Sequence, residues 1–271
     1  MRTFESLVDE AMAAPVHGWD FSWMDGRRVD VDSLPWSWFV EIASAVAATD
    51  ARTMLDMGTG GGEVLARYAA SGVGPVPEAT WASEAWPPNV AVAAALLRPL
   101  GIGVVGAEGA PDNCVWPGPG SGGRLPFRRR SVDVVINRHE AYAPDEVRAA
   151  LSPHGRFLTQ QVGGSDEEEW STWFGRPAEH ACRGWGRAEA VAQASASGFE
   201  VLESGEAFPR SSFSDVGAVV HYLRLIPWSV PEFDPLGTDA AALRSLHERI
   251  EADGPLDLRS HRYWFVARPY D

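Results

Sequence analysis

A glycine-rich turn between an apolar strand and a helix is the feature that most constrains this chain. Segment 54–63 reads MLDMGTGGGE, in which an apolar run ends in Asp56, turns on glycines and continues into a helical pattern. Glycines let the backbone adopt left-handed dihedrals and let a ligand approach without a Cβ in the way. A strand, a glycine turn and a helix form a nucleotide-binding corner, so this segment predicts an α/β fold.

Glu63 distinguishes this turn from the dinucleotide-binding fingerprint G-x-G-x-x-G. Counted from Gly58, the last glycine of that fingerprint falls on Glu63, whose carboxylate would repel a pyrophosphate. Asp56, two residues before Gly58, suits a ligand that carries an ammonium and a sulfonium. The turn therefore disfavours a nicotinamide oxidoreductase.

Further strand-like segments follow the turn in a fixed order. They lie at 79–84, 102–109, 131–137 (after the tripeptide Leu125-Pro126-Phe127) and 151–159. The last opens with the turn L-x-P-x-G, in which His154 stands where a glycine is usual. Together with segment 54–63, these elements resemble the motifs of the class I S-adenosylmethionine-dependent methyltransferases.

The resemblance implies both a fold and a cofactor. The expected fold is a doubly wound, seven-stranded Rossmann-like sheet, mostly parallel with a reversed last strand. The expected cofactor is S-adenosyl-L-methionine. Segment 261–268 would form the reversed strand, placed at the edge of the sheet.

We expect two regions along the chain. Residues 1–50 would be a helical N-terminal extension or lid, with helices at 4–13 and 36–48, the second packing against the sheet edge. Residues 51–271 would be the methyltransferase domain, with a helical insertion at about 212–254 after strand six. Helices at 212–225 and 239–252 make up that insertion.

Composition narrows the classes of ligand and compartment. All 23 basic residues are arginine, and the absence of lysine excludes a standard P-loop and a lysine Schiff base. The net charge of −14 disfavours a nucleic-acid substrate, because phosphates would be repelled. The two cysteines, Cys114 and Cys182, argue against a disulfide scaffold or thiolate zinc site, and no apolar run is long enough to span a bilayer. The N-terminus is acidic and unlike a signal peptide. We expect a cytoplasmic protein with a small-molecule or peptide acceptor, and a homodimer is the assembly to test.

The resemblance assigns the cofactor to the turns that follow the first four strands. The implied residues are Asp56, Gly58, Thr59, Gly60 and Glu63, then Glu84 and Ala85, then Ala107, Glu108 and Gly109, and finally Asn137 and Arg138. Asp56 and the glycines would hold the methionyl part, Glu84 the ribose hydroxyls, and Glu108 the adenine amino group. Taken alone, Glu84 would more readily be explained as a surface acid at a strand end, and its position one element after the glycine turn is what favours the ribose role. Trp19 and Phe21 would close over the methionine moiety, or act as a hydrophobic staple.

The segment after the fourth strand, Asn137 to Tyr142, is too polar for a buried turn without a purpose. His139 is the first candidate for a general base because the pKa of imidazole lies near neutrality. Glu140, Tyr142 and His221 are the alternatives, and His139 has a positioning role if no base is needed. The expected substrate contacts are Gln161, Tyr222 and Trp228, and core packing is an equal alternative for Tyr222 and Trp228. The seven histidines show no metal-ligand spacing, so no metal is expected.

These observations favour a methyltransferase that acts on oxygen or nitrogen of a small molecule, which includes peptide and natural-product acceptors. An RNA or protein methyltransferase is the alternative within enzymes, and a non-catalytic S-adenosylmethionine-binding protein is the alternative outside them. The signature N/D-P-P-Y/F of amide and base N-methyltransferases is absent after the fourth strand, which makes that chemistry less favoured.

Overall fold

The computed structural model describes residues 2–16, 20–176 and 182–270, which form two compact units. Unit 1 combines Met1–Leu34, Ser165–Arg183 and Phe208–His261. Unit 2 combines Pro35–Gly164, Gly184–Ala207 and Arg262–Asp271. The N-terminal extension expected at 1–50 is thus divided, because its second helix belongs to unit 2.

Unit 2 contains a seven-stranded sheet in the order β4-β3-β2-β5-β6-β10-β7. Its strands are β2 (Thr53–Met57), β3 (Ala79–Glu84), β4 (Gly103–Gly106), β5 (Val132–Arg138), β6 (Leu151–Val162), β7 (Phe199–Ala207) and β10 (Arg262–Pro269). The neighbours from β4 to β6 pair in parallel, and β10 alone is reversed. The predicted Rossmann-like sheet with a reversed last strand is confirmed.

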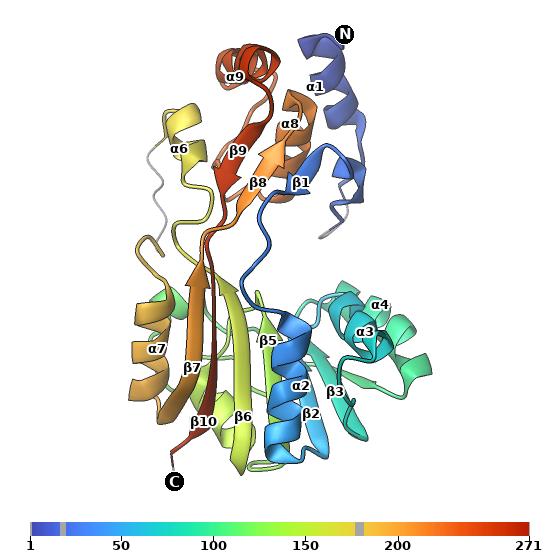
Figure 1. Ribbon diagram of the computed structural model, residues 1–271, viewed down its shortest axis with the longest axis vertical. Helices are drawn as coiled ribbons and strands as arrows, with labels where there is room; N and C mark the ends of the chain where they lie inside the picture. Colours follow the sequence, from blue (N-terminus) through green and yellow to red (C-terminus); the bar gives the residue numbers. More distant parts are fainter. Residues whose placement is uncertain (1, 17–19, 177–181, 271) are drawn as a thin grey trace. The chain divides into compact units, whose positions relative to one another are not determined.

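The position predicted for the reversed strand was wrong. β10 pairs with β6 on one side and with β7 on the other, so β7 forms the edge of the sheet (Figure 1). Trp264 and Phe265 of β10 are both buried, one in the core on each face of the sheet. A strand that is apolar on both faces suits an interior position better than an edge.

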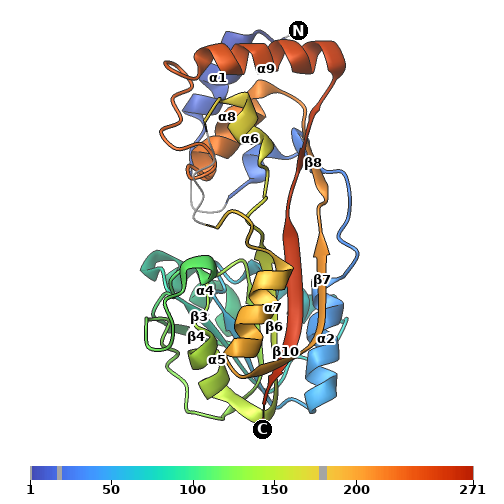
Figure 2. The ribbon, with the colours of Figure 1, turned by 90° about the vertical axis from the view of Figure 1, so that its left-hand side faces the viewer.

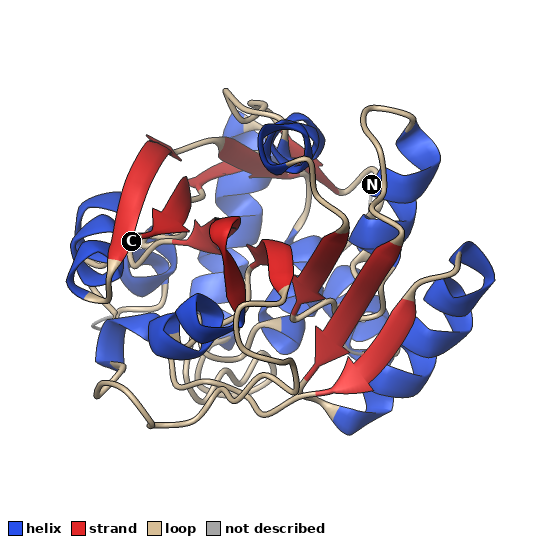
Figure 3. Cartoon of the chain, turned by 90° about the horizontal axis from the view of Figure 1, so that it is seen from below, coloured by secondary structure: helices blue, strands red, loops and turns tan. Residues whose placement is uncertain are grey.

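Helices cover both faces of this sheet. One face is covered by α2 (Trp38–Thr49), α3 (Glu63–Ser71) and α4 (Pro87–Leu97), and the 3₁₀ turn η2 (Arg98–Leu100) follows α4. The other face is covered by α5 (Pro144–Ala150) and α7 (Arg187–Ala196). A further 3₁₀ turn, η3 (Asn113–Val115), lies in a connecting loop. Figure 2 shows α2 on one side of β6 and β10 and α5 and α7 on the other, and Figure 3 shows the strands between helical layers. Consecutive strand residues such as Val134 and Val135 enter opposite cores because side chains alternate along a strand. α2 therefore packs on a face of the sheet, and the expected packing against its edge was wrong.

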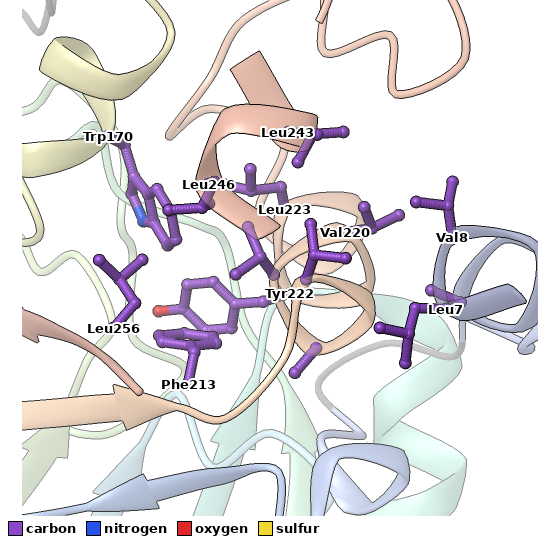
Figure 4. Packing of buried hydrophobic residues seen from close by; sticks show 14 of the residues in the cluster. Leu7, Val8, Trp170, Phe213, Val220, Tyr222, Leu223, Leu243, Leu246 and Leu256 are labelled. Carbon is purple, nitrogen blue, oxygen red and sulfur yellow. The ribbon is translucent and has the colours of Figure 1, made fainter. Parts of the chain in front are cut away.

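Unit 1 is built from three separate stretches of chain. Its elements are α1 (Phe4–Ala13), η1 (Ser22–Met24), β1 (Arg28–Asp30), α6 (Glu169–Trp173), β8 (Arg210–Phe213), α8 (Val216–Leu225), α9 (Ala240–Asp253) and β9 (Leu256–Arg259). The strands form a sheet in the order β1-β8-β9, and Figure 4 shows the apolar core, in which Tyr222, Phe213 and Trp170 meet leucines of α8 and α9. The helix predicted from Ser212 begins at Val216, because residues 210–213 pair as a strand and Asp215 caps the helix by accepting a hydrogen bond from the Ala218 amide (3.0 Å).

In the described ranges, no helix has both the length and the apolar character that crossing a membrane requires.

Candidate functional site

The turn between β2 and α3 is folded against the end of β3. The amides of Gly58 and Thr59 donate to the Ser83 carbonyl at 3.0 and 2.9 Å, and the Gly60 amide donates to Glu84 Oε2 at 2.7 Å. Gly58 and Gly60 have φ angles of 71° and 61°, in the left-handed region that favours glycine. Glycine at these positions avoids the cost of about 1–2 kcal/mol that another residue would carry in this conformation.

Glu84 holds a fixed position beside the turn. Its second oxygen, Oε1, accepts a hydrogen bond from the Trp86 amide at 2.8 Å, and the residue is 6% exposed. A carboxylate has about four acceptor positions on its two oxygens, so two backbone donors leave capacity for ligand hydroxyls. The predicted ribose contact is compatible with this geometry.

Asp56 is buried behind the turn. Thr59 Oγ1 donates to Asp56 Oδ2 at 2.6 Å, which ties the end of β2 to the turn. Burial raises the pKa of Asp56 to about 6, the Thr59 hydrogen bond and the charge of Arg138 lower it, and Glu84 raises it further. In this arrangement Asp56 shapes the glycine turn from within.

A small cavity that is open to solvent lies in front of the turn. Its polar lining includes Ser83, Glu84, Glu108, Glu140 and Tyr142. Three of these are acids, and no basic side chain of the described chain is part of the lining. The hydroxyls of Ser83 and Tyr142 are buried, each residue is 1% exposed, and neither has a hydrogen-bond partner among the described residues. Because buried polar groups without partners are costly, a ligand or solvent that hydrogen-bonds to the Ser83 hydroxyl would be stabilised there.

Of the other predicted cofactor residues, Ala85 and Ala107 line this cavity together with Glu108, and Gly109 follows directly in the chain. Glu63 is the first residue of α3 and its carboxyl folds back over Gly61. A carboxylate at a helix N-terminus occupies the place that a phosphate would need.

His139 stands at the turn after β5 with a left-handed φ of 59°, which is uncommon for a residue other than glycine. The Trp36 indole N–H donates to Gln160 Oε1 at 2.8 Å, and Gln160 Nε2 lies 3.1 Å from His139 Nε2. An indole N–H only donates, so the side-chain oxygen of Gln160 faces Trp36 and its amide N–H faces His139. His139 Nε2 therefore accepts this hydrogen bond. The proton of the neutral imidazole then lies on Nδ1. Protein atoms around the ring and the charges of Arg138 and Arg262 lower the pKa of His139 well below its usual value, although the residue is exposed.

An amide network holds the same turn from the other face of the sheet. The side chain of Asn137 donates to the Met57 carbonyl at 3.1 Å and accepts from Thr159 and Gln161 at 2.8 and 2.6 Å. Gln161 Nε2 also donates to the Glu140 carbonyl at 2.9 Å. Gln161, predicted to contact the substrate, is 7% exposed and fixes the backbone on which Glu140 stands.

Two further candidates for proton transfer lie on this turn. Burial and the charges of Glu84 and Asp112 raise the pKa of Glu140 to about 7. Burial raises the pKa of Tyr142 well above its ordinary value, and its ring packs edge-on against Phe157 at 4.9 Å. At neutral pH, Tyr142 is therefore a neutral phenol embedded in the core.

The remaining predicted residues belong to unit 1, and Trp19 lies outside the described residues. His221 is fully buried with its ring 4.5 Å from that of Trp23. Tyr222 donates its hydroxyl to Glu167 at 2.9 Å, and its ring lies 6.1 Å from that of Phe21. Trp228 is 49% exposed. Their catalytic, cofactor and substrate roles stay predictions.

Sequence reasoning missed two residues of the site. Ser83 was detectable as a polar residue directly before the strand-end acid Glu84. Trp36 carried no such signal, since its link to His139 through Gln160 depends on a contact across 124 residues of sequence. Over the described residues, no group of three or more His, Cys, Asp and Glu side chains is arranged to hold a metal ion.

No protein-family model matches the sequence, and neither does any curated protein sequence. A protein of Bacillus halodurans C-125 that is thought to be a methyltransferase is 16% identical, with a TM-score of 0.56 over 87% of this chain and 100% of its own. The YcgJ protein of Bacillus subtilis is 15% identical, with a TM-score of 0.53 over 86% of this chain and 98% of its own. The chain has the class I methyltransferase fold. At such low identity this likeness establishes the fold alone, and the reaction has to be argued from the site.

Proposed function

We propose that this protein is an S-adenosylmethionine-dependent methyltransferase that acts on an oxygen or nitrogen of a small-molecule acceptor. The observation that carries the proposal is the acid-lined cavity at the glycine turn, where Glu84 is held by two backbone amides. This cavity lies at the carboxyl ends of parallel strands, where open α/β sheets bind their ligands.

The residues present fit this cofactor better than a dinucleotide. Glu84 has acceptor capacity for ribose hydroxyls, and Ser83, whose buried hydroxyl has no partner among the described residues, lines the same cavity. Glu63 at the start of α3 opposes a pyrophosphate. When bound, S-adenosylmethionine supplies an electrophilic methyl group. Glu84 would hold the ribose, and Glu108 at the cavity wall would face the adenine.

His139 would orient the acceptor, and general-base catalysis by its Nε2 is not favoured. The Nε2 lone pair accepts from Gln160, and the lowered pKa makes the imidazole a weak base. Methyl transfer depends chiefly on alignment of the nucleophile with the departing sulfur, so a fixed neutral imidazole is useful for positioning. Charge supports a small acceptor over a nucleic acid, because the chain carries −14 and the cavity lining is acidic.

Isothermal titration with S-adenosylmethionine, S-adenosylhomocysteine and NAD tests the proposal. We expect micromolar binding of the first two. Glu84→Ala should weaken that binding by about 1.5–3 kcal/mol, because charge-assisted hydrogen bonds to two hydroxyls are lost. Glu78→Ala is the matched control, since Glu78 is exposed and precedes the start of β3. Binding of NAD with no heat from either sulfur compound would refute the proposal.

A further inference from the structure

Glu140 occupies an unusual place in the cavity. Its side chain lies directly over Gly58, so that a Cβ built on Gly58 would fall 3.2 Å from Glu140 Cδ and would overlap Cγ and Cβ. The backbone beneath it is fixed, because Gln161 holds the Glu140 carbonyl and the preceding residue has a left-handed φ of 59°. The carboxyl group is thereby held at the turn that receives the ligand.

The Glu140 carboxyl also lacks any compensating group. Within the described residues it accepts no hydrogen bond and forms no ion pair, whereas Glu84 accepts from two backbone amides. The charges that act on it are those of Glu84 and Asp112, both negative. An acid held at a fixed position against other acids is stabilised in its charged form by a ligand that carries positive charge.

A second observation supports a ligand in this space. Ser83 is 1% exposed and lines the same cavity, and its hydroxyl has no hydrogen-bond partner in the described chain. No guanidinium of the described residues is part of the lining. A ligand that complements the cavity must therefore bring both hydrogen-bonding atoms and positive charge.

We propose that Glu140 is the residue that makes the cavity select a sulfonium, so that the protein prefers S-adenosylmethionine to its demethylated product. This inference rests on the proposed function. The two compounds share the adenosine, ammonium and carboxylate groups and differ at the sulfur, which is positive in the first and neutral in the second. A carboxylate at the sulfur stabilises the first alone. The consequence is weak inhibition by product.

Titration at pH 8 of the wild type, Glu140→Gln and the control Glu78→Gln tests the inference. Gln keeps the shape of Glu140 and removes its charge. We expect the wild type to bind S-adenosylmethionine about tenfold or more tightly than S-adenosylhomocysteine, the factor that corresponds to about 1.4 kcal/mol. Glu140→Gln should weaken binding of the first compound about tenfold and change that of the second by less than about twofold. Glu78→Gln should change neither.

A third probe, sinefungin, carries an ammonium group where the cofactor has its sulfonium. We expect its affinity to change as that of S-adenosylmethionine does, falling in Glu140→Gln and staying unchanged in Glu78→Gln. An unchanged affinity ratio in Glu140→Gln, or an equal loss for both ligands, overturns the inference and leaves the proposed function standing. Absence of binding of all three ligands to the wild type overturns the proposed function itself. Circular dichroism of each variant establishes that the fold is retained before the ratios are compared.

Discussion

The contact between Glu140 and Gly58 predicts that two similar glycines will respond differently to the same substitution. Gly58 and Gly60 lie in one turn with φ angles of 71° and 61°. An alanine at either position carries the cost of a left-handed L-residue, about 1–2 kcal/mol. A Cβ at Gly60 would meet nothing within 4 Å, whereas a Cβ at Gly58 would overlap the side chain of Glu140.

The size of the difference follows from that overlap. Forcing extra carbon into a packed site costs about 1–3 kcal/mol, because side chains and backbone must shift. We therefore expect Gly60→Ala to lower the free energy of unfolding by about 1–2 kcal/mol and Gly58→Ala by about 2–5 kcal/mol. The substitution Glu140→Gly removes both overlapping carbons, so Gly58→Ala should cost about 1–3 kcal/mol less in that background.

Hydrogen exchange of peptides that cover β2 and β5, measured across a urea series, reports the stability of unit 2 separately from unit 1. The proteins to compare are the wild type, Gly58→Ala, Glu140→Gly, the double mutant of these two substitutions, and Gly60→Ala. Equal destabilisation by the two alanines, or an unchanged cost of Gly58→Ala in the Glu140→Gly background, would refute the placement of Glu140 over the turn.

Two other outcomes follow from the titrating groups. Burial and Asp166 raise the pKa of Glu167 from 4.5 to about 7, despite hydrogen bonds from Trp170 and Tyr222, so the folded state holds a proton that the unfolded state releases. The free energy of unfolding of unit 1 should accordingly fall as pH rises from about 4.5 to about 7. Glu167→Gln should flatten this dependence in hydrogen exchange of α6 and α8, and an equal slope in the variant would contradict the assignment. For His139, ¹⁵N NMR at pH 6.5 should show a neutral ring with its proton on Nδ1. A doubly protonated ring at that pH would contradict the hydrogen-bond chain from Trp36 through Gln160 to His139 Nε2.

The sheet and the glycine turn of unit 2 were predictable because their signals are local. The apolar run of 131–137 and the glycines of 58–62 specify a buried strand and a left-handed turn without knowledge of what surrounds them. Glu84 was predictable for the same reason, since a strand-end acid one element after the turn falls at the same edge of the sheet.

Unit 1 and the details of the site were not predictable in this way. β1, β8 and β9 have three or four residues each, too few for a periodic pattern, and β1 pairs with β8 across about 180 residues of sequence. The left-handed φ of His139 does not follow from its residue type, and its amide donates to the carbonyl of Gln160 on a neighbouring strand at 2.8 Å. The overlap of Glu140 with Gly58 depends on a side-chain rotamer, which residue types alone do not specify.

The interior position of β10 has a consequence for how this protein is made. β6 ends at Val162 and its partner β10 begins at Arg262, so 99 residues must be synthesised between them. At about 5–20 residues per second, the ribosome needs roughly 5–20 s for that stretch. Throughout this interval the nascent sheet presents the twelve-residue strand β6 with an open edge, which a second nascent chain on the same messenger could pair with. Slowing translation between codons 163 and 262 should therefore lower the yield of folded protein, and a chaperone that covers strand edges should restore it.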